Sequence, residues 1–171
     1  PHALYDSEQG PQTTLESNST AAANPNYPLD NTSTAFKSNG FRISTGTGRI
    51  NTTDSYVSWT FRKAPRFFDC VTWSGDGTTD REIPHNLGVV PGMVVIKATN
   101  QNDVWYVHHR SLGFGQYLDL SGTNYANQYG AYPPISAATD STITLVRDTG
   151  TNGSNSTYVA YIFAHDPVGE N

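Results

Sequence analysis

The stretch REIPHNLGVVPGMVVIKATN, Arg81 to Asn100, decides the fold, because a compact turn runs directly into a continuous apolar segment. Proline restricts the residue before it and glycine accepts a positive φ, so Pro84 to Gly88 predicts a turn. The β-branched run in residues 92–99 predicts a buried strand. The residues assigned to this structural turn and strand entry are Pro84, His85, Asn86, Gly88, Pro91 and Gly92.

His85 is interpreted as part of the turn and not as a reactive group. A lone histidine has no second histidine at metal-ligand spacing, and the chain contains no HExxH or zinc-type Cys/His pattern. An imidazole can instead satisfy backbone groups of the turn. The sequence therefore predicts no metal site and no cofactor.

Outward from this stretch the chain is a series of short β patterns separated by turns. The expected strands are FFDCVTW (67–73), DVWYVHH (103–109), TITLVRD (142–148), YVSWTF (56–61) and YVAYIF (158–163). Hairpins are expected around Asn100–Asn102 and between residues 142–148 and 157–163. No window shows a sustained helical period. The predicted fold class is all-β, an antiparallel, jelly-roll-like β-sandwich.

The chain also contains an internal repeat. SYVSWTFRKAP (55–65) matches TYVAYIFAHDP (157–167) at an offset of 102 residues, Tyr56 against Tyr158. The same offset aligns FRISTGTG (41–48) with ITLVRDTG (143–150). Fixed-offset similarity is the signature of repeated structural units.

Weaker matches with an offset one residue larger extend the repeat. LYDSEQG (4–10) lies against VHHRSLG (107–113), and Leu15-Glu16 against Leu118-Asp119. The sequence predicts a first unit, residues 1–65, that holds the closing strands of a repeat, and a complete second unit, residues 66–171; alternatively, the two merge into one globular domain. The second unit has a front section, residues 66–106, without a counterpart in the first, so we expect the front of the first unit to lie upstream.

Composition excludes several classes of function. The net charge is −5 and the basic residues are scattered, which argues against binding of a nucleic acid backbone. Cys70, the single cysteine, cannot form an intrachain disulfide and is expected to be buried. No apolar run is long enough to span a bilayer, so no membrane insertion is expected.

The candidate catalytic residues lack the partner residues that catalysis needs. His108 and His109 point to opposite faces of a strand, so they cannot serve one site together. The acidic residues mostly lie in turns, where Asp bonds its own backbone, and no pair suggests a glycosidase. Asp76 and Asp80 leave a weaker alternative, a calcium site, although the EF-hand spacing is absent. We therefore expect no enzyme activity and assign no catalytic residues.

The best candidate for a binding surface is SGTNYANQYGAYPP, residues 121–134, which has no strand pattern. Tyrosines provide flat faces for stacking, and amides provide adaptable donors and acceptors for hydroxyl groups. The alternative is that these tyrosines are buried at the edge of the sandwich or against a neighbouring subunit. The candidate ligand-binding residues are Tyr125, Tyr129, Tyr132, Asn124, Asn127 and Gln128.

The second unit contains four motifs in a fixed order: IPHNLGVVPGMVVIKATN, WYVHHRSLG, YLDL and STYVAYIFAHD. With these motifs it resembles a repeated β domain of uncharacterised function in tailed bacteriophages, particularly marine and cyanobacterial phages. SNGFRISTGTGRINTTDSYVSWTFRKAP resembles the closing half of the same domain. The resemblance implies a virion surface part, such as a trimeric tail fibre, and offers no catalytic residues. The chain departs from the pattern in residues 121–134 and at His108, where a tyrosine is expected.

The function expected from the resemblance is that of a tail-fibre or receptor-binding module of a virion. Its partners would be a host surface glycan or protein and other virion proteins, in a homotrimer. The alternatives are a purely structural virion protein, such as a capsid decoration or a tail or baseplate component, and a glycan depolymerase. A structural virion protein would bury the tyrosines of residues 121–134 at an interface. A glycan depolymerase would need two facing carboxylates.

Overall fold

A computed structural model describes residues 2–30, 34–44, 50–123, 126–128, 133–146 and 149–165. Its elements are almost all antiparallel β-strands, and no described helix is long and apolar enough to cross a membrane. The elements are β1 (Ala3–Leu4), β2 (Leu15–Glu16), β3 (Phe36–Lys37), β4 (Gly40–Phe41), β5 (Phe68–Ser74), β6 (Arg81–Pro84), β7 (Pro91–Ala98), β8 (Tyr106–His109), the 3-10 turn η1 (Arg110–Leu112), β9 (Gln116–Asp119), β10 (Asn127–Gln128), β11 (Ile135–Ala138), β12 (Thr142–Leu145), α1 (Thr149–Asn152) and β13 (Thr157–Ala164).

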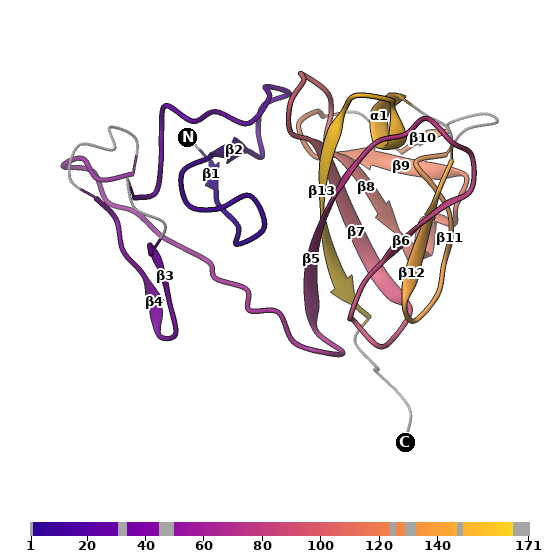
Figure 1. The fold of residues 1–171 in the computed structure, drawn as a ribbon, viewed down its shortest axis with the longest axis horizontal. Coiled ribbons are helices and arrows are strands. Elements are labelled where there is room, and N and C mark those ends of the chain that lie inside the picture. Colours follow the sequence, from indigo (N-terminus) through magenta and orange to yellow (C-terminus); the bar gives the residue numbers. More distant parts are fainter. Residues whose placement is uncertain are drawn as a thin grey trace.

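The larger sheet has six strands in the order β10-β9-β8-β7-β13-β5. β13 lies between β7 and β5 and pairs with both along its length (Figure 1). Its β-branched and aromatic residues, like those of β7, suit a strand that is buried on both faces. The predicted hairpin around Asn100–Asn102 is confirmed, because β7 and β8 are antiparallel neighbours.

A three-stranded sheet, β11-β12-β6, packs against one face of the six-stranded sheet and encloses the main core. Trp73 on β5 stacks on Tyr158 on β13, with ring centroids 5.4 Å apart. The all-β, sandwich-like fold is thus confirmed. The buried core residues are Trp73, Ile83, Leu87, Val94, Ile96, Ala98, Tyr106, Ile135, Ile143, Leu145, Tyr158, Ala160 and Ile162.

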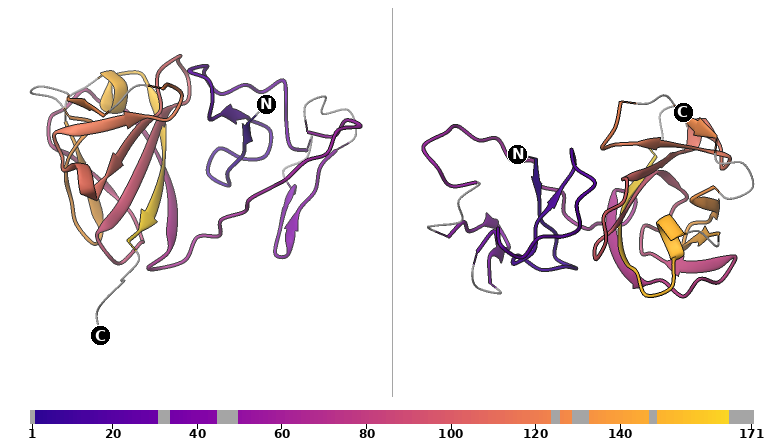
Figure 2. Two further views of the ribbon diagram at one scale, coloured as in Figure 1. Left: turned by 180° about the vertical axis from the view of Figure 1, so that it is seen from behind. Right: turned by 90° about the horizontal axis from the view of Figure 1, so that it is seen from above.

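The other face of the six-stranded sheet is covered by residues 2–30, which form a third layer (Figure 2). Leu15 packs there in a second core with Phe68, Cys70, Val95, Trp105, Val107, Val159 and Tyr161. The indole N–H of Trp105 donates to the carbonyls of Glu16 and Ser19, both at 3.0 Å. The Tyr161 hydroxyl donates to the buried Asp6 carboxylate at 2.6 Å. Hydrogen bonds from Trp105 and Tyr161 therefore fix the position of this layer on the sheet, together with its apolar contacts.

The structure describes the turn expected at Pro84 to Gly88. His85 is buried; its backbone N–H donates to the carbonyl of Ser141, and its Nδ1 accepts from the N–H of Leu87 at 3.2 Å. The N–H of Asn86 donates to the Asp69 carboxylate at 2.7 Å, and Gly88 has φ +70°. The chain thus passes from the smaller sheet to the start of the larger one.

Pro91 and Gly92 open strand β7 as expected from their place after the turn. A Cβ on Gly92 would lie 2.9 Å from the Cα of His165, just after β13. Glycine is therefore required here by the close approach of two backbones.

The expected hairpin between residues 142–148 and 157–163 is wrong. β12 pairs with β11 and β6 in the smaller sheet, whereas β13 pairs with β5 and β7 in the larger one. The short helix α1 lies between them, and the chain crosses from one sheet to the other. Two neighbouring strand patterns do not reveal whether they pair with each other or pack face to face.

The expected strand at residues 56–61 is also wrong for the described structure. This segment has no strand partner, and its apolar side chains are exposed. Its pattern satisfies the local requirement for a strand, but a strand also needs neighbours to complete its hydrogen bonds.

Strand pairing in the two units agrees with the sequence repeat. Leu4 pairs with Leu15 as their counterparts Val107 and Leu118 pair in the second unit. Phe36 likewise pairs with Phe41, as Ala138 pairs with Ile143. Two hairpins of the first unit therefore have the register of their counterparts, although the division of the chain at residue 65 stays a prediction.

Candidate functional site

The tyrosine-rich segment leaves the edge of the larger sheet and enters the smaller one. β10, within this segment, pairs with β9, so that Asn127 lies opposite Tyr117 and Gln128 opposite Gln116. Asn124, Tyr125, Tyr129 and Tyr132 lie outside the described residues. Of the six predicted binding residues, the structure therefore places only Asn127 and Gln128, by their backbone pairing.

Asp119 shapes the base of this segment, where the chain leaves β9. Its Oδ1 accepts from the backbone N–H of Ser121 at 2.8 Å and from the Ser121 hydroxyl at 2.5 Å. A Cβ on Gly122 would lie 2.7 Å from the Asp119 carboxylate. The segment therefore starts from a tightly specified turn on a paired strand.

Exposed apolar side chains lie close to the base of the segment in the sequence. Leu118, on β9, and Leu120, directly after it, are 36% and 50% exposed. The N–H of Leu120 donates to the carbonyl of Trp105 at 3.1 Å, which holds its backbone against the sheet. Rigidly held apolar residues of this kind are common in binding surfaces.

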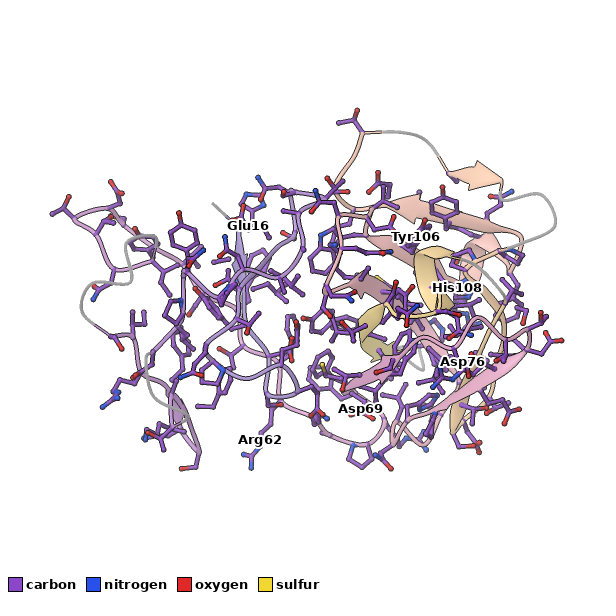
Figure 3. All side chains as sticks on the ribbon, turned by 45° about the horizontal axis from the view of Figure 1, so that its top comes forward. Glu16, Arg62, Asp69, Asp76, Tyr106 and His108 are labelled. Carbon is purple, nitrogen blue, oxygen red and sulfur yellow. The ribbon has the colours of Figure 1, made fainter. Side chains whose placement is uncertain are left out.

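A hollow of about 320 Å³ lies beside the 3-10 turn η1. His108 forms part of its wall and stacks on Phe114, with centroids 4.9 Å apart and the rings 2° from parallel. Figure 3 labels His108 and Tyr106, both on β8. The residues lining the hollow are Val90, Pro91, His108, Arg110, Gly113, Phe114 and Ala138.

The lining of the hollow favours a flat or apolar group that carries hydrogen-bond acceptors. Burial lowers the pKa of His108, with a smaller contribution from His109, so the ring is neutral near pH 7. Arg110 adds a fixed cation, and Phe114 adds a partly exposed aromatic face. A sugar ring or a tyrosine side chain meets these requirements.

His108 and His109 are consecutive on β8 and lie in different environments. The ring of His108 is buried, while His109 is partly exposed and its Nδ1 accepts from the N–H of Ser111 at 3.3 Å. His109 thereby caps η1. Each of the two histidines therefore has a structural contact: His108 stacks on Phe114, and His109 caps η1.

Asp76, one of the two residues of the calcium alternative, makes structural contacts. Its Oδ1 accepts from the N–H and hydroxyl of Thr78, at 2.9 and 2.7 Å, and from the Asn152 amide at 2.9 Å. The bonds from Thr78, with further help from Asn152 and Arg81, lower the pKa of Asp76 to about 2. Within the described ranges, no three His, Cys, Asp or Glu side chains form a metal-binding group.

Cys70 is buried, as its place in an alternating apolar strand predicts. Desolvation raises the pKa of its thiol, with a further contribution from nearby Asp6. The thiolate needed for nucleophilic chemistry is therefore disfavoured.

Sequence reasoning missed the hollow and the contribution of Phe114. The apolar residues in SLGFGQYLDL were a usable signal, because Phe114 is flanked by two glycines and has no strand around it to bury it. The other lining residues come from η1 and its C-cap and from the starts or ends of β7, β8 and β11. Only the tertiary structure brings those ends together.

No curated protein and no solved structure matches the chain. A family described as a domain of unknown function, DUF7483, matches residues 1–167, and so takes in both the N-terminal layer and the sandwich. The chain belongs to the DUF7483 family.

Proposed function

We propose that the chain is a non-enzymatic attachment module on the surface of a phage virion, of the tail-fibre type, which binds a glycan or protein of the host surface. The observation that carries the proposal is that Asn127 and Gln128, within the tyrosine-rich segment, form the edge strand β10 of the larger sheet. The exposed Leu118 and Leu120 lie close to them in sequence. Segments held on a rigid scaffold are the usual place for binding residues. The phage resemblance of the sequence supports the viral setting.

The chemistry of this segment suits a hydroxyl-rich or mixed polar ligand. Its tyrosines supply stacking faces and its amides supply hydrogen-bond donors and acceptors. The neutral His108, Arg110 and Phe114 offer a second contact region beside η1. In a trimeric fibre, several weak sites on one particle would combine into strong attachment.

A purely structural virion component is the second candidate. The observation in its favour is that residues 2–30 bury apolar side chains against the larger sheet, as in contacts between stacked modules. In that case the tyrosines of residues 121–134 would be buried at an interface with another subunit. The experiment below distinguishes the two candidates.

The proposal is tested by the variant Tyr125→Ser, Tyr129→Ser and Tyr132→Ser in the full chain. We expect loss of binding to host cells and to the glycans that the parent chain recognises on an array, by roughly tenfold or more, because each aromatic contact is worth about 0.5–1.5 kcal/mol. Binding is measured by adsorption of labelled protein, with folding checked by circular dichroism.

The matched control is Phe67→Ser, at the other end of the larger sheet. Phe67 is 51% exposed and precedes β5, the strand at the opposite edge of the larger sheet from β10, so this variant removes an exposed aromatic ring away from the proposed site. Unchanged adsorption by the folded triple variant would contradict receptor binding. Loss of particle assembly with adsorption intact would favour the structural candidate.

A further inference from the structure

Residues 55–63 have the pattern of a strand but belong to none of the sheets that the described residues form. Tyr56, Val57, Trp59 and Phe61 are 49%, 83%, 84% and 50% exposed. Apolar residues alternate along the segment, with Val57, Trp59 and Phe61 on one face of an extended chain. In Figure 1 the segment runs as an extended connection, without a strand arrow, towards the start of β5. The neighbouring Arg62 is exposed and points away from the rest of the molecule (Figure 3).

The counterpart of this segment in the second unit is β13, a largely buried strand inside the larger sheet. Tyr158, Val159 and Tyr161 on β13 correspond to Tyr56, Val57 and Trp59 in the repeat, and they are 1%, 0% and 7% exposed. β13 owes this burial to β5 on one side and β7 on the other. The exposed segment thus lacks two neighbouring strands, and the repeat indicates that these would be the equivalents of β5 and β7.

The two hairpins of the first unit also lack neighbouring strands, and the missing strands correspond to the same section of the second unit. β1–β2 corresponds to β8–β9, and β8 pairs on its other side with β7. β3–β4 corresponds to β11–β12, and β12 pairs on its other side with β6. Every neighbour that the first unit lacks therefore corresponds to β5, β6 or β7, and one continuous section, residues 68–98, holds all three.

We propose that residues 3–63 are the back half of a second sandwich of the same fold, and that residues 56–61 form its central strand when a front section of the same kind binds. That front section would have the pattern of residues 66–98 and would supply strands equivalent to β5, β6 and β7. It would be joined ahead of β1, as β7 is joined to β8 by the short connection 99–105. The inference is independent of receptor binding.

Contacts at the end of the segment already prepare it for this role. Phe61 packs against Phe68 and Phe163, with ring centroids 5.6 and 5.4 Å apart. Ala64 and Phe68 exchange backbone hydrogen bonds at 2.9 and 3.1 Å. The segment is therefore held at one end, beside the complete unit, while Val57 and Trp59 stay exposed.

A second copy of the described chain does not offer the same place. Its position between β5 and β7 is filled by its own β13, which pairs with β5 through seven residue pairs from Thr157–Ser74 to Phe163–Phe68. The outer edge of β5 is partly occupied as well, because the N–H of Cys70 donates to Asp69 and the carbonyl of Ser74 accepts from Arg81. A front section without its own closing strand fits better.

The test compares the full chain with the same chain extended at its N-terminus by a copy of its own residues 66–102. Hydrogen exchange followed by mass spectrometry reports on peptides that cover residues 55–63. We expect exchange there to slow by roughly 100-fold or more in the extended chain, because a central strand opens only by larger unfolding.

The variant Trp59→Asp supplies the specific control. In the unextended chain it should leave the unfolding midpoint unchanged, because Trp59 is exposed there. In the extended chain it should abolish the new protection, because a charge would be placed within a sheet. Fast exchange of residues 55–63 in a folded extended chain would overturn the proposal. Protection that grows with the concentration of the unextended chain would also overturn it, in favour of self-association.

Discussion

At the scale of single residues, two of the five histidines, His85 and His108, are buried and have a lowered pKa. Desolvation lowers the pKa of His85, although Asp69 and Asp140 oppose it, and burial also lowers that of His108. His85 has no hydrogen-bond partner at Nε2 among the described residues. Its Nδ1 accepts from Leu87, so the neutral ring carries its proton on that unpartnered nitrogen.

These two histidines predict that the protein is less stable in mild acid. The unfolded chain takes up a proton at each histidine near pH 6.5, whereas the folded chain does so only at lower pH. The free energy of unfolding should therefore fall as the pH decreases below about 6.5. Urea unfolding at pH 7.5 and pH 5.5, followed by tryptophan fluorescence, measures the fall.

The variant His108→Phe isolates one of the two contributions. Phenylalanine can keep the stacking on Phe114 and removes a titrating group. The fall in stability between pH 7.5 and pH 5.5 should become smaller. An unchanged pH dependence would show that His108 does not titrate with folding.

At the scale of elements, neighbours decide which apolar segments become strands. Residues 56–61 and β13 share Tyr, Val and Phe at matching positions, yet only β13 is paired. The loop that leads from β5 to β6 also depends on tertiary contacts. There the N–H of Gly75 donates to the carbonyl of Ser156 at 2.7 Å, beside the end of α1.

Gly75→Ala should destabilise this junction by about 1–3 kcal/mol through overpacking. A Cβ at this position would lie 2.1 Å from the carbonyl oxygen of Gly153, which is backbone and cannot rotate away. The matched control is Gly115→Ala, where a Cβ would meet no atom within 4 Å. Thermal unfolding of both variants measures the difference, and equal midpoints would contradict the close approach of the two backbones.

At the scale of the whole molecule, the N-terminal layer and the sandwich share a core. Leu15 is 1% exposed and packs on the face of the sheet that carries Trp105 and Tyr161. Asp6 adds a buried hydrogen bond to Tyr161. Residues 2–30 are therefore part of the folded unit and not a loose extension, although they contain only two short strands.

Leu15→Ala should cost about 2–5 kcal/mol, the usual range for truncating a buried leucine. Its counterpart Leu118 is 36% exposed, so Leu118→Ala should cost much less. Urea unfolding gives both values, and limited proteolysis should cut residues 2–30 faster in the Leu15 variant. Equal stability of the two variants would contradict the packing of the N-terminal layer on the sheet.

Local pattern determined most of the strands by itself. β5, β7 and β13 lie where their alternating or continuous apolar runs predict, and the Pro84 to Gly88 turn lies where glycine and proline restrict the backbone. The repeat was also visible in the sequence, and two of its hairpins have matching registers. Periodicity and backbone restriction are local properties, so a single sequence expresses them.

Only the tertiary structure decided which strands pair, which apolar faces are covered and where a hollow forms. β12 and β13 follow each other but lie in different sheets, and the wall beside η1 combines His108 with Val90 and Ala138 from other elements. Residues 56–61 satisfy the local pattern and still form no strand with the described residues. The physical reason is that hydrogen bonds between strands and the burial of apolar area depend on neighbours distant in the chain, whose positions no local pattern specifies.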